Sequence, residues 1–283
     1  MNPCLHASRS RLTAFLSLAV SILALWAAIA VVSIDRLYGD LLDIGSISPF
    51  LLSGSLAQDI ISIPIAVILA MLSMAFLKSP GVKVFVSMLG LAGYFFYGYG
   101  LYVMQGQYTS FYLAYLAIFG LSLHSLIWGL TSFKPESIHQ LSLPDGLRRA
   151  VAIFLTTIMV VLGPLWLIRI SGDIAKNTPG ETYAVFILDL CVVFPAFGII
   201  AALLFWQQPF GYFLAGVALF KTLSICLSVA FGEWFVAWHG GFLPNNGMIA
   251  VFGVLSLFSL ALFILYLQRL EAPDCLCNQS KWQ

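Results

Sequence analysis

Charged residues are scarce in this chain of 283 residues. Asp, Glu, Lys and Arg make up only 9% of it, and hydrophobic residues make up 61%. A soluble domain has about 25% charged and about 45–50% apolar residues, so this composition excludes a soluble enzyme or a disordered protein. The net charge of +1 provides no basic excess for binding nucleic acid. We predict a multi-pass membrane protein that contacts the lipid bilayer.

Motifs for catalysis and for cofactors are also missing. The sequence has no HExxH motif, no Walker A loop and no glycine fingerprint for a dinucleotide. The five cysteines, at positions 4, 191, 226, 275 and 277, form no disulfide framework of the secreted kind. We therefore assign no catalytic residue, no cofactor and no metal site, and a membrane-embedded enzyme is the least favoured class.

Eight stretches are apolar enough to cross a bilayer, which takes about 20 residues. The first exceeds the apolar core of about 7–15 residues typical of a signal peptide, so we expect it to be a retained helix. The predicted fold class is all-α, a bundle of eight transmembrane helices forming one membrane domain over 1–283, with a short cytoplasmic tail at 270–283. The stretches are 12–34, 59–77, 83–104, 110–131, 150–169, 182–206, 210–232 and 247–268.

The distribution of lysine and arginine predicts the orientation of the chain. Nine fall on the side that holds both termini, three fall on the opposite side, and Lys221 lies within a span. Because cytoplasmic loops carry the excess of basic residues, both termini are predicted to be cytoplasmic. The nine are Arg9, Arg11, Lys78, Lys83, Lys134, Arg148, Arg149, Arg269 and Lys281, and the three are Arg36, Arg169 and Lys176.

The two halves of the chain share a pattern at an offset of about four spans. Asp59 and Pro64 in the second span match Asp189 and Pro195 in the sixth. An offset of four whole spans keeps both halves in the same orientation, which predicts a parallel repeat about an axis along the membrane normal. The predicted half-repeats are residues 12–131 and 150–268.

Asp189 and Lys221 are the charged residues deepest in the predicted spans, and such residues are functional candidates because burying charge in a membrane is costly. Counting from the turn between their helices places them roughly 9 Å apart in depth. Three interpretations are open. In the first the two form a structural ion pair, and in the second Asp189 lines a water-filled outer cavity as a proton or cation site. Alternatively, Lys221 reaches toward the cytoplasm while Asp189 bonds a hydroxyl.

Two further intramembrane candidates are Asp59 and His124. Asp59 follows Ser55, which reads as a helix cap at the start of the second span and makes Asp59 a first-turn carboxylate. We expect His124 to be packed and hydrogen-bonded, since a metal role would need partners at its depth. The tyrosines of the third span indicate an interfacial belt and close packing, with a ligand-stacking wall as the alternative.

Polar and aromatic residues also gather after the seventh span. Glu233, Trp234, Trp238 and His239 are predicted to lie in the last outer loop, residues 233–247. This loop would lie flat on the membrane or cover an outer cavity, and its residues are candidate contacts for a partner.

A set of short motifs resembles a family of bacterial multi-pass membrane proteins that has no assigned function. It comprises Gln58-Asp59 leading to Pro64, the tyrosine-rich third span, the Leu121-Ser122-Leu123 run, and the Asp189…Lys221 segment. Gln207 and Gln208 stand where the family has an arginine-rich turn. The resemblance implies a location in the bacterial cytoplasmic membrane and supplies no mechanism.

The sequence favours the translocation of a small solute, a proton or another cation, with its site in the outer half of the bundle. The alternative is a sensor or assembly subunit that binds a partner membrane protein, or a second copy of the chain, through its outer acidic and aromatic loops.

Overall fold

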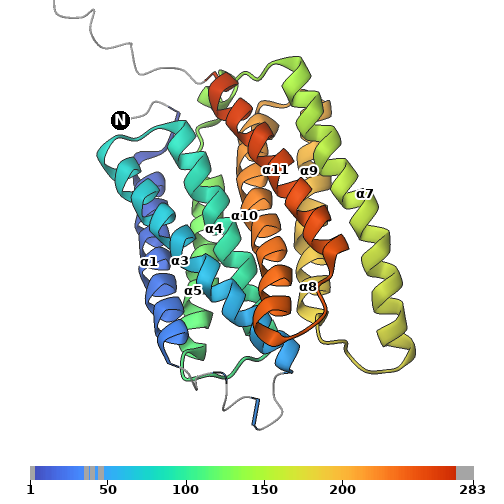
Figure 1. The fold of residues 1–283 in the computed structure, drawn as a ribbon. Coiled ribbons are helices and arrows are strands. Elements are labelled where there is room, and N and C mark those ends of the chain that lie inside the picture. Colours follow the sequence, from blue (N-terminus) through green and yellow to red (C-terminus); the bar gives the residue numbers. More distant parts are fainter. Residues whose placement is uncertain (1–3, 35–37, 39–41, 44–47, 272–283) are drawn as a thin grey trace, which may run out of the picture.

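The protein is an all-α bundle with eight helices long and apolar enough to cross a membrane, as predicted (Figure 1). The computed structural model describes residues 4–34, 38, 42–43 and 48–271. The predicted tail beyond residue 271, with Cys275 and Cys277, lies outside the described residues. Seven spans are single helices: α1 (Ala7–Ser33), α3 (Pro49–Lys78), α4 (Val82–Met104), α5 (Tyr112–Leu130), α7 (Asp145–Ala175), α10 (Pro209–Gly240) and α11 (Asn246–Arg269). The sixth span is built from α8 (Tyr183–Leu188), the π-helical turn η1 (Asp189–Val193) and α9 (Phe194–Phe205), and a short α6 (Pro135–Ile138) precedes α7.

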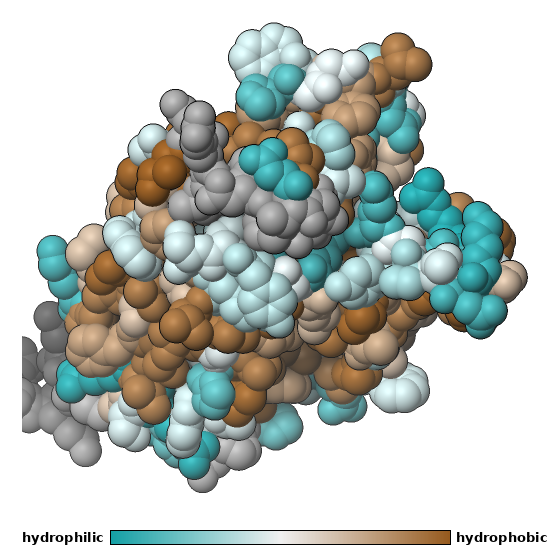
Figure 2. Space-filling view, turned by 90° about the horizontal axis from the view of Figure 1, so that it is seen from below, coloured by the Kyte–Doolittle hydropathy of each residue, from teal (hydrophilic) through white to brown (hydrophobic). Residues whose placement is uncertain are grey.

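Successive spans run in opposite directions, so the loops gather at two ends of the bundle (Figure 1). We call one the basic end, because it holds Lys78, Lys83, Lys134, Arg148 and Arg269. The other is the acidic end, which holds the loops at 105–111, 176–182 and 241–245. Figure 2 views the molecule from the acidic end, where polar and apolar side chains lie beside one another.

Several helices extend past their predicted bounds. α3 begins at Pro49, where the Ser48 hydroxyl accepts a hydrogen bond from the Leu51 N–H at 3.2 Å. The prediction that Ser55 caps this helix is therefore wrong, and Asp59 lies three turns inside it. α10 continues to Gly240, ending at Gly241 with φ of +69°, so the predicted loop at 233–247 shrinks to 241–245.

α4 lies at the centre of the bundle, between α3, α5 and α10. Its glycines allow α10 to approach closely: a Cβ at Gly90 would lie 2.7 Å from the Cβ of Phe220. The prediction of close packing is confirmed, but the interfacial belt is wrong. Tyr94, Tyr99 and Tyr102 are buried in the core, because α4 has neighbouring helices on nearly every side.

The two halves of the bundle differ most in the contact between their first and last helices. In the first half, α1 packs along α5, and the Ser17 and Ser125 hydroxyls are 2.7 Å apart. In the second half, α7 packs against α9 but meets α11 only marginally, with Phe154 and Phe258 ring centroids 5.3 Å apart toward the basic end. Toward the acidic end α7 and α11 separate, and a cavity lies between them.

Candidate functional site

A cavity of about 920 Å³ opens at the acidic end of the second half. Its walls come from α7, the sixth span, α10 and α11, with Tyr97 and Leu101 of α4 at the back. On α7 the lining begins at Ile158 and on α10 at Lys221, so the cavity occupies only the acidic half of the bundle. We call it the acidic-end pocket.

The basic end of the same four-helix group is closed. Arg148 is 2% exposed, and its guanidinium donates to the Leu204 carbonyl oxygen at 2.5 Å, which ties α7 to the last turn of α9. The same side chain pairs with Asp145 at 2.8 Å. These contacts join α7 to α9 on the basic side of the pocket.

Asp189 begins the π-helical turn of the sixth span. Pro195 follows the turn, and its nitrogen has no hydrogen to donate to the Cys191 carbonyl. The backbone is widened here, and the Phe194 N–H donates to the Asp189 carbonyl oxygen. Such π-turns are frequent at functional sites, and Asp189, the first residue of this one, lines the pocket.

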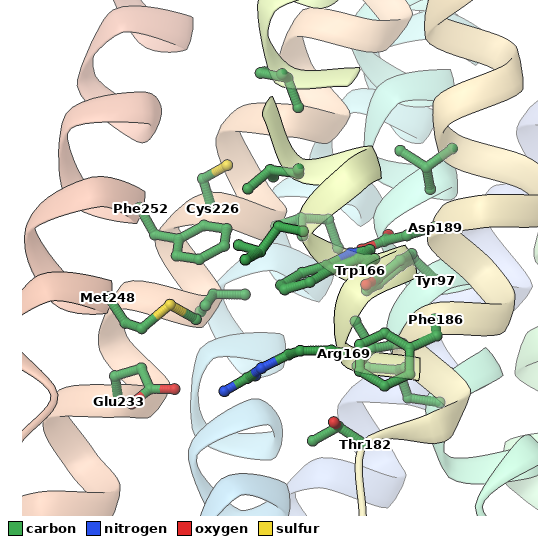
Figure 3. A pocket seen from close by; sticks show the side chains of 18 of the residues that line it. Tyr97, Trp166, Arg169, Thr182, Phe186, Asp189, Cys226, Glu233, Met248 and Phe252 are labelled. Atoms are coloured by element: carbon green, nitrogen blue, oxygen red, sulfur yellow. The ribbon is translucent and has the colours of Figure 1, made fainter. Parts of the chain in front are cut away.

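A tryptophan holds the Asp189 carboxylate in place. The Trp166 indole N–H donates to Asp189 Oδ2 at 2.7 Å, and both residues are buried. Tyr97 of α4 lies beside the same carboxylate (Figure 3). The acid therefore lies between aromatic side chains from two helices, α7 and α4.

Lys221 shares the deep end of the pocket with Asp189 without pairing to it. Its ammonium lies over the Tyr97 ring, 4.6 Å from the centroid, and 5.6 Å from that of Phe197. Among the described residues the ion pair within 4.0 Å is that of Arg148 and Asp145. Of the three interpretations, a direct ion pair is not formed, and Lys221 points into the pocket rather than toward the basic end. Asp189 does line a cavity.

Four more charged residues line the pocket nearer its mouth. They are Arg169, Asp173, Glu181 and Glu233. Arg169 extends from α7 into the cavity, and Glu233 enters from α10 (Figure 3). Glu233 was predicted as an outer-loop contact, but it lies in a helix and belongs to the pocket wall.

The other predicted outer-loop residues lie on the last turns of α10. Trp234 and Trp238 are stacked, with ring centroids 5.7 Å apart, and both are exposed. His239 stacks on Phe235 at 5.0 Å. These three residues are absent from the pocket lining, and their placement in a loop was wrong because α10 is two turns longer than its most apolar stretch.

Asp59 lies in the first half, away from the pocket, and is 1% exposed. Its Oδ2 accepts a hydrogen bond from the Tyr38 hydroxyl at 2.6 Å, and its Oδ1 has no partner among the described residues. Burial, and then the neighbouring Asp59 carboxylate, raises the pKa of Tyr38, so this hydroxyl remains a donor through the ordinary pH range.

His124 faces outward from α5 and is exposed. Its Nδ1 lies 2.8 Å from the Gly120 carbonyl oxygen of its own helix, so the predicted hydrogen bond is confirmed and the predicted packing is wrong. Within the described part of the chain, no group of three or more His, Cys, Asp or Glu side chains is placed to hold a metal ion.

Sequence reasoning missed Trp166, Arg169 and Thr222 as members of the site. Counting depth from the 176–182 loop into both flanking helices would have placed Trp166 near Asp189, as the same counting did for Lys221. Thr222 has no such signal, since a threonine in an apolar helix is common. Its buried hydroxyl lines the pocket and has no hydrogen-bond partner among the described residues.

No protein-family model, no curated protein and no solved structure matches this chain. The resemblance noted from the sequence remains a prediction.

Proposed function

We propose that this protein translocates a small solute or cation across the bacterial cytoplasmic membrane, with the acidic-end pocket as its binding site. The observation that carries the proposal is the placement of Asp189 and Lys221. Both line the deep end of one cavity, near the middle of the bundle, and among the described residues neither forms an ion pair within 4.0 Å. Unpaired intramembrane charges facing a cavity mark solute and ion pathways.

We further propose that the acidic end faces outward and that both termini are cytoplasmic. The excess of lysine and arginine at the basic end supports this orientation. The conformation described above is then open to the outside and closed at the cytoplasmic end, where Arg148 joins α7 to α9.

The predicted duplication suggests how the pocket changes sides. Each half has the same order of neighbours, since α1–α3 and α4–α5 correspond to α7–α9 and α10–α11. The halves meet mainly where α10 crosses α4 and α3. Rocking of one half against the other about this contact would close the acidic end and open the basic end, as in transporters built from repeats.

Sided cysteine labelling tests the proposal without knowledge of the solute. Val229 lines the pocket and is replaced by Cys in a chain whose native cysteines are Ser. Exposed Lys176→Cys and Ser79→Cys report on the acidic and basic ends. With a membrane-impermeant thiol reagent, we expect Lys176→Cys to react from outside, Ser79→Cys from inside, and Val229→Cys from both. Reaction of Val229→Cys from the outside alone would contradict translocation.

The second candidate function is the binding of a partner through the acidic end. The stacked and exposed Trp234 and Trp238 favour it, because exposed aromatic pairs are common in interfaces. Labelling of Val229→Cys from one side only, together with a second membrane protein that is lost from the purified complex on replacing both tryptophans by Ala, would support this candidate instead.

A further inference from the structure

The acidic-end pocket carries more negative than positive charge. Four carboxylates line it, those of Asp173, Glu181, Asp189 and Glu233, against the two cations Arg169 and Lys221. In a low-dielectric wall this excess favours a positively charged occupant. Asp189 lies at the deep end, and the other three carboxylates lie nearer the mouth.

The deep end has the chemistry of an ammonium site. The Asp189 carboxylate is fixed by the Trp166 N–H at 2.7 Å, and the rings of Tyr97 and Phe197 face the same space. Aromatic faces attract ammonium and other organic cations, most strongly where water is excluded. A carboxylate framed by such faces adds charge attraction to that preference.

The chain's own lysine now occupies this site. The Lys221 ammonium lies over the Tyr97 ring, and its stem passes Gly93, where an added Cβ would lie 3.2 Å from Lys221 Cγ. No carboxylate of the described residues lies within 4.0 Å of it, so the Asp189 charge attracts this ammonium without forming a direct ion pair. It can withdraw when another cation enters.

The size and walls of the pocket indicate that the cation is organic. A volume of about 920 Å³ is far larger than a metal ion needs and falls within the range of about 300–1,000 Å³ for pockets that bind small molecules. Its walls away from the charges are apolar, with Leu162, Ile225 and Phe252 among them.

We propose that the acidic-end pocket binds an organic cation, a positively charged nitrogen on an apolar body, and that the Lys221 ammonium takes the place of that cation when the pocket is empty. This inference names the solute class of the proposed translocation and rests on it only for the transport step. Lys221 then acts as a built-in competitor that the solute displaces.

Replacing Lys221 by Met should change binding in opposite directions for a cationic and an anionic ligand. The full chain is purified in detergent, and binding of ethidium, a permanent organic cation, is measured by fluorescence anisotropy. Removing the competitor in Lys221→Met should tighten binding by roughly tenfold, and Asp189→Asn should weaken it by roughly tenfold. Lys83→Met, an exposed change at the basic end, should leave binding unchanged.

An anionic probe of similar size, anilinonaphthalene sulfonate, provides the opposite test. If the pocket takes anions, Lys221→Met weakens binding of the sulfonate and leaves ethidium no tighter, which would overturn the inference. Equal ethidium binding by wild type, Asp189→Asn and Lys221→Met would also overturn it, because it shows partition into the micelle.

A second acidic variant keeps the test decisive where Asp189→Asn fails to fold. Glu233→Gln removes a carboxylate from the pocket wall without touching the Trp166 hydrogen bond, and it should weaken ethidium binding in the same direction. Unchanged binding in Glu233→Gln and looser binding in Lys221→Met would together reject the cation. Two-sided labelling of Val229→Cys would then still support translocation, so the two proposals fail separately.

Discussion

Replacing Trp166 by Phe removes one hydrogen bond from the deep end of the pocket and keeps most of the aromatic packing. The lost bond is the 2.7 Å contact from the indole N–H to Asp189 Oδ2. The edge-on contact between Trp166 and Phe186, with ring centroids 5.6 Å apart, is available to a phenyl ring as well. The variant therefore tests mainly whether this donor stabilises the buried carboxylate.

The expected loss follows from the charge of the acceptor. A hydrogen bond to an ionised group contributes about 1.5–3 kcal/mol net, compared with about 0.5–1.5 kcal/mol for a neutral pair. At roughly 2–4 °C per kcal/mol for a chain of this size, the midpoint of thermal unfolding should fall by about 3–12 °C. Trp206→Phe at the basic end, where the indole is 72% exposed, should leave the midpoint unchanged.

A double-mutant cycle separates the hydrogen bond from the lost ring volume. Asn at position 189 keeps an acceptor for Trp166 but carries no charge, so Trp166→Phe should cost only about 0.5–1.5 kcal/mol in that background. Thermal unfolding of both single variants and the double variant in the same detergent gives the coupling. An equal loss from Trp166→Phe in both backgrounds would refute the view that Trp166 stabilises an ionised Asp189.

Two further predictions concern packing and the first half. Gly216→Ala should destabilise the protein by about 1–3 kcal/mol, because the added Cβ would lie 2.5 Å from Cζ of Tyr266. At Gly253 an added Cβ meets nothing within 4 Å, so Gly253→Ala should cost nothing. Thermal unfolding of the two variants compares them. Asp59→Ala should lose about 1–3 kcal/mol of folding free energy, because the buried Tyr38 hydroxyl then has no acceptor. Asp59→Asn retains an acceptor and should not show this loss. Equal losses in the two variants would contradict the role of this hydrogen bond.

The number of spans could be predicted from the sequence because each apolar run is close to or above the length of about 20 residues that crosses the bilayer core. The start of α3 could not. Ser53, Ser55 and Asp59 interrupt its apolar pattern, yet all three are buried against neighbouring helices. Polar residues that face protein lower the local hydropathy in the same way as a loop does, so the first turns of the helix looked like a connection.

The candidate site was predictable in depth but not in direction. Residue counting placed Asp189 and Lys221 at neighbouring levels, and the structure puts both in one pocket. Counting cannot tell which way a side chain turns about its helix. The π-turn at Asp189 changes that direction by adding a residue to the turn, and the Tyr97 ring offers Lys221 a contact other than the carboxylate.

The contrast between the two halves explains why one carboxylate is a candidate site and the other is not. Asp59 and Asp189 both lie in the second span of their half. In the first half α1 and α5 are joined through Ser17 and Ser125, and the helices of that half enclose Asp59. In the second half α7 and α11 diverge from Phe154 toward the acidic end, and Asp189 faces the pocket between them. Under the proposed duplication, the first half then serves as the packed support, and the loss of one helix–helix contact in the second half provides the space in which a solute can bind.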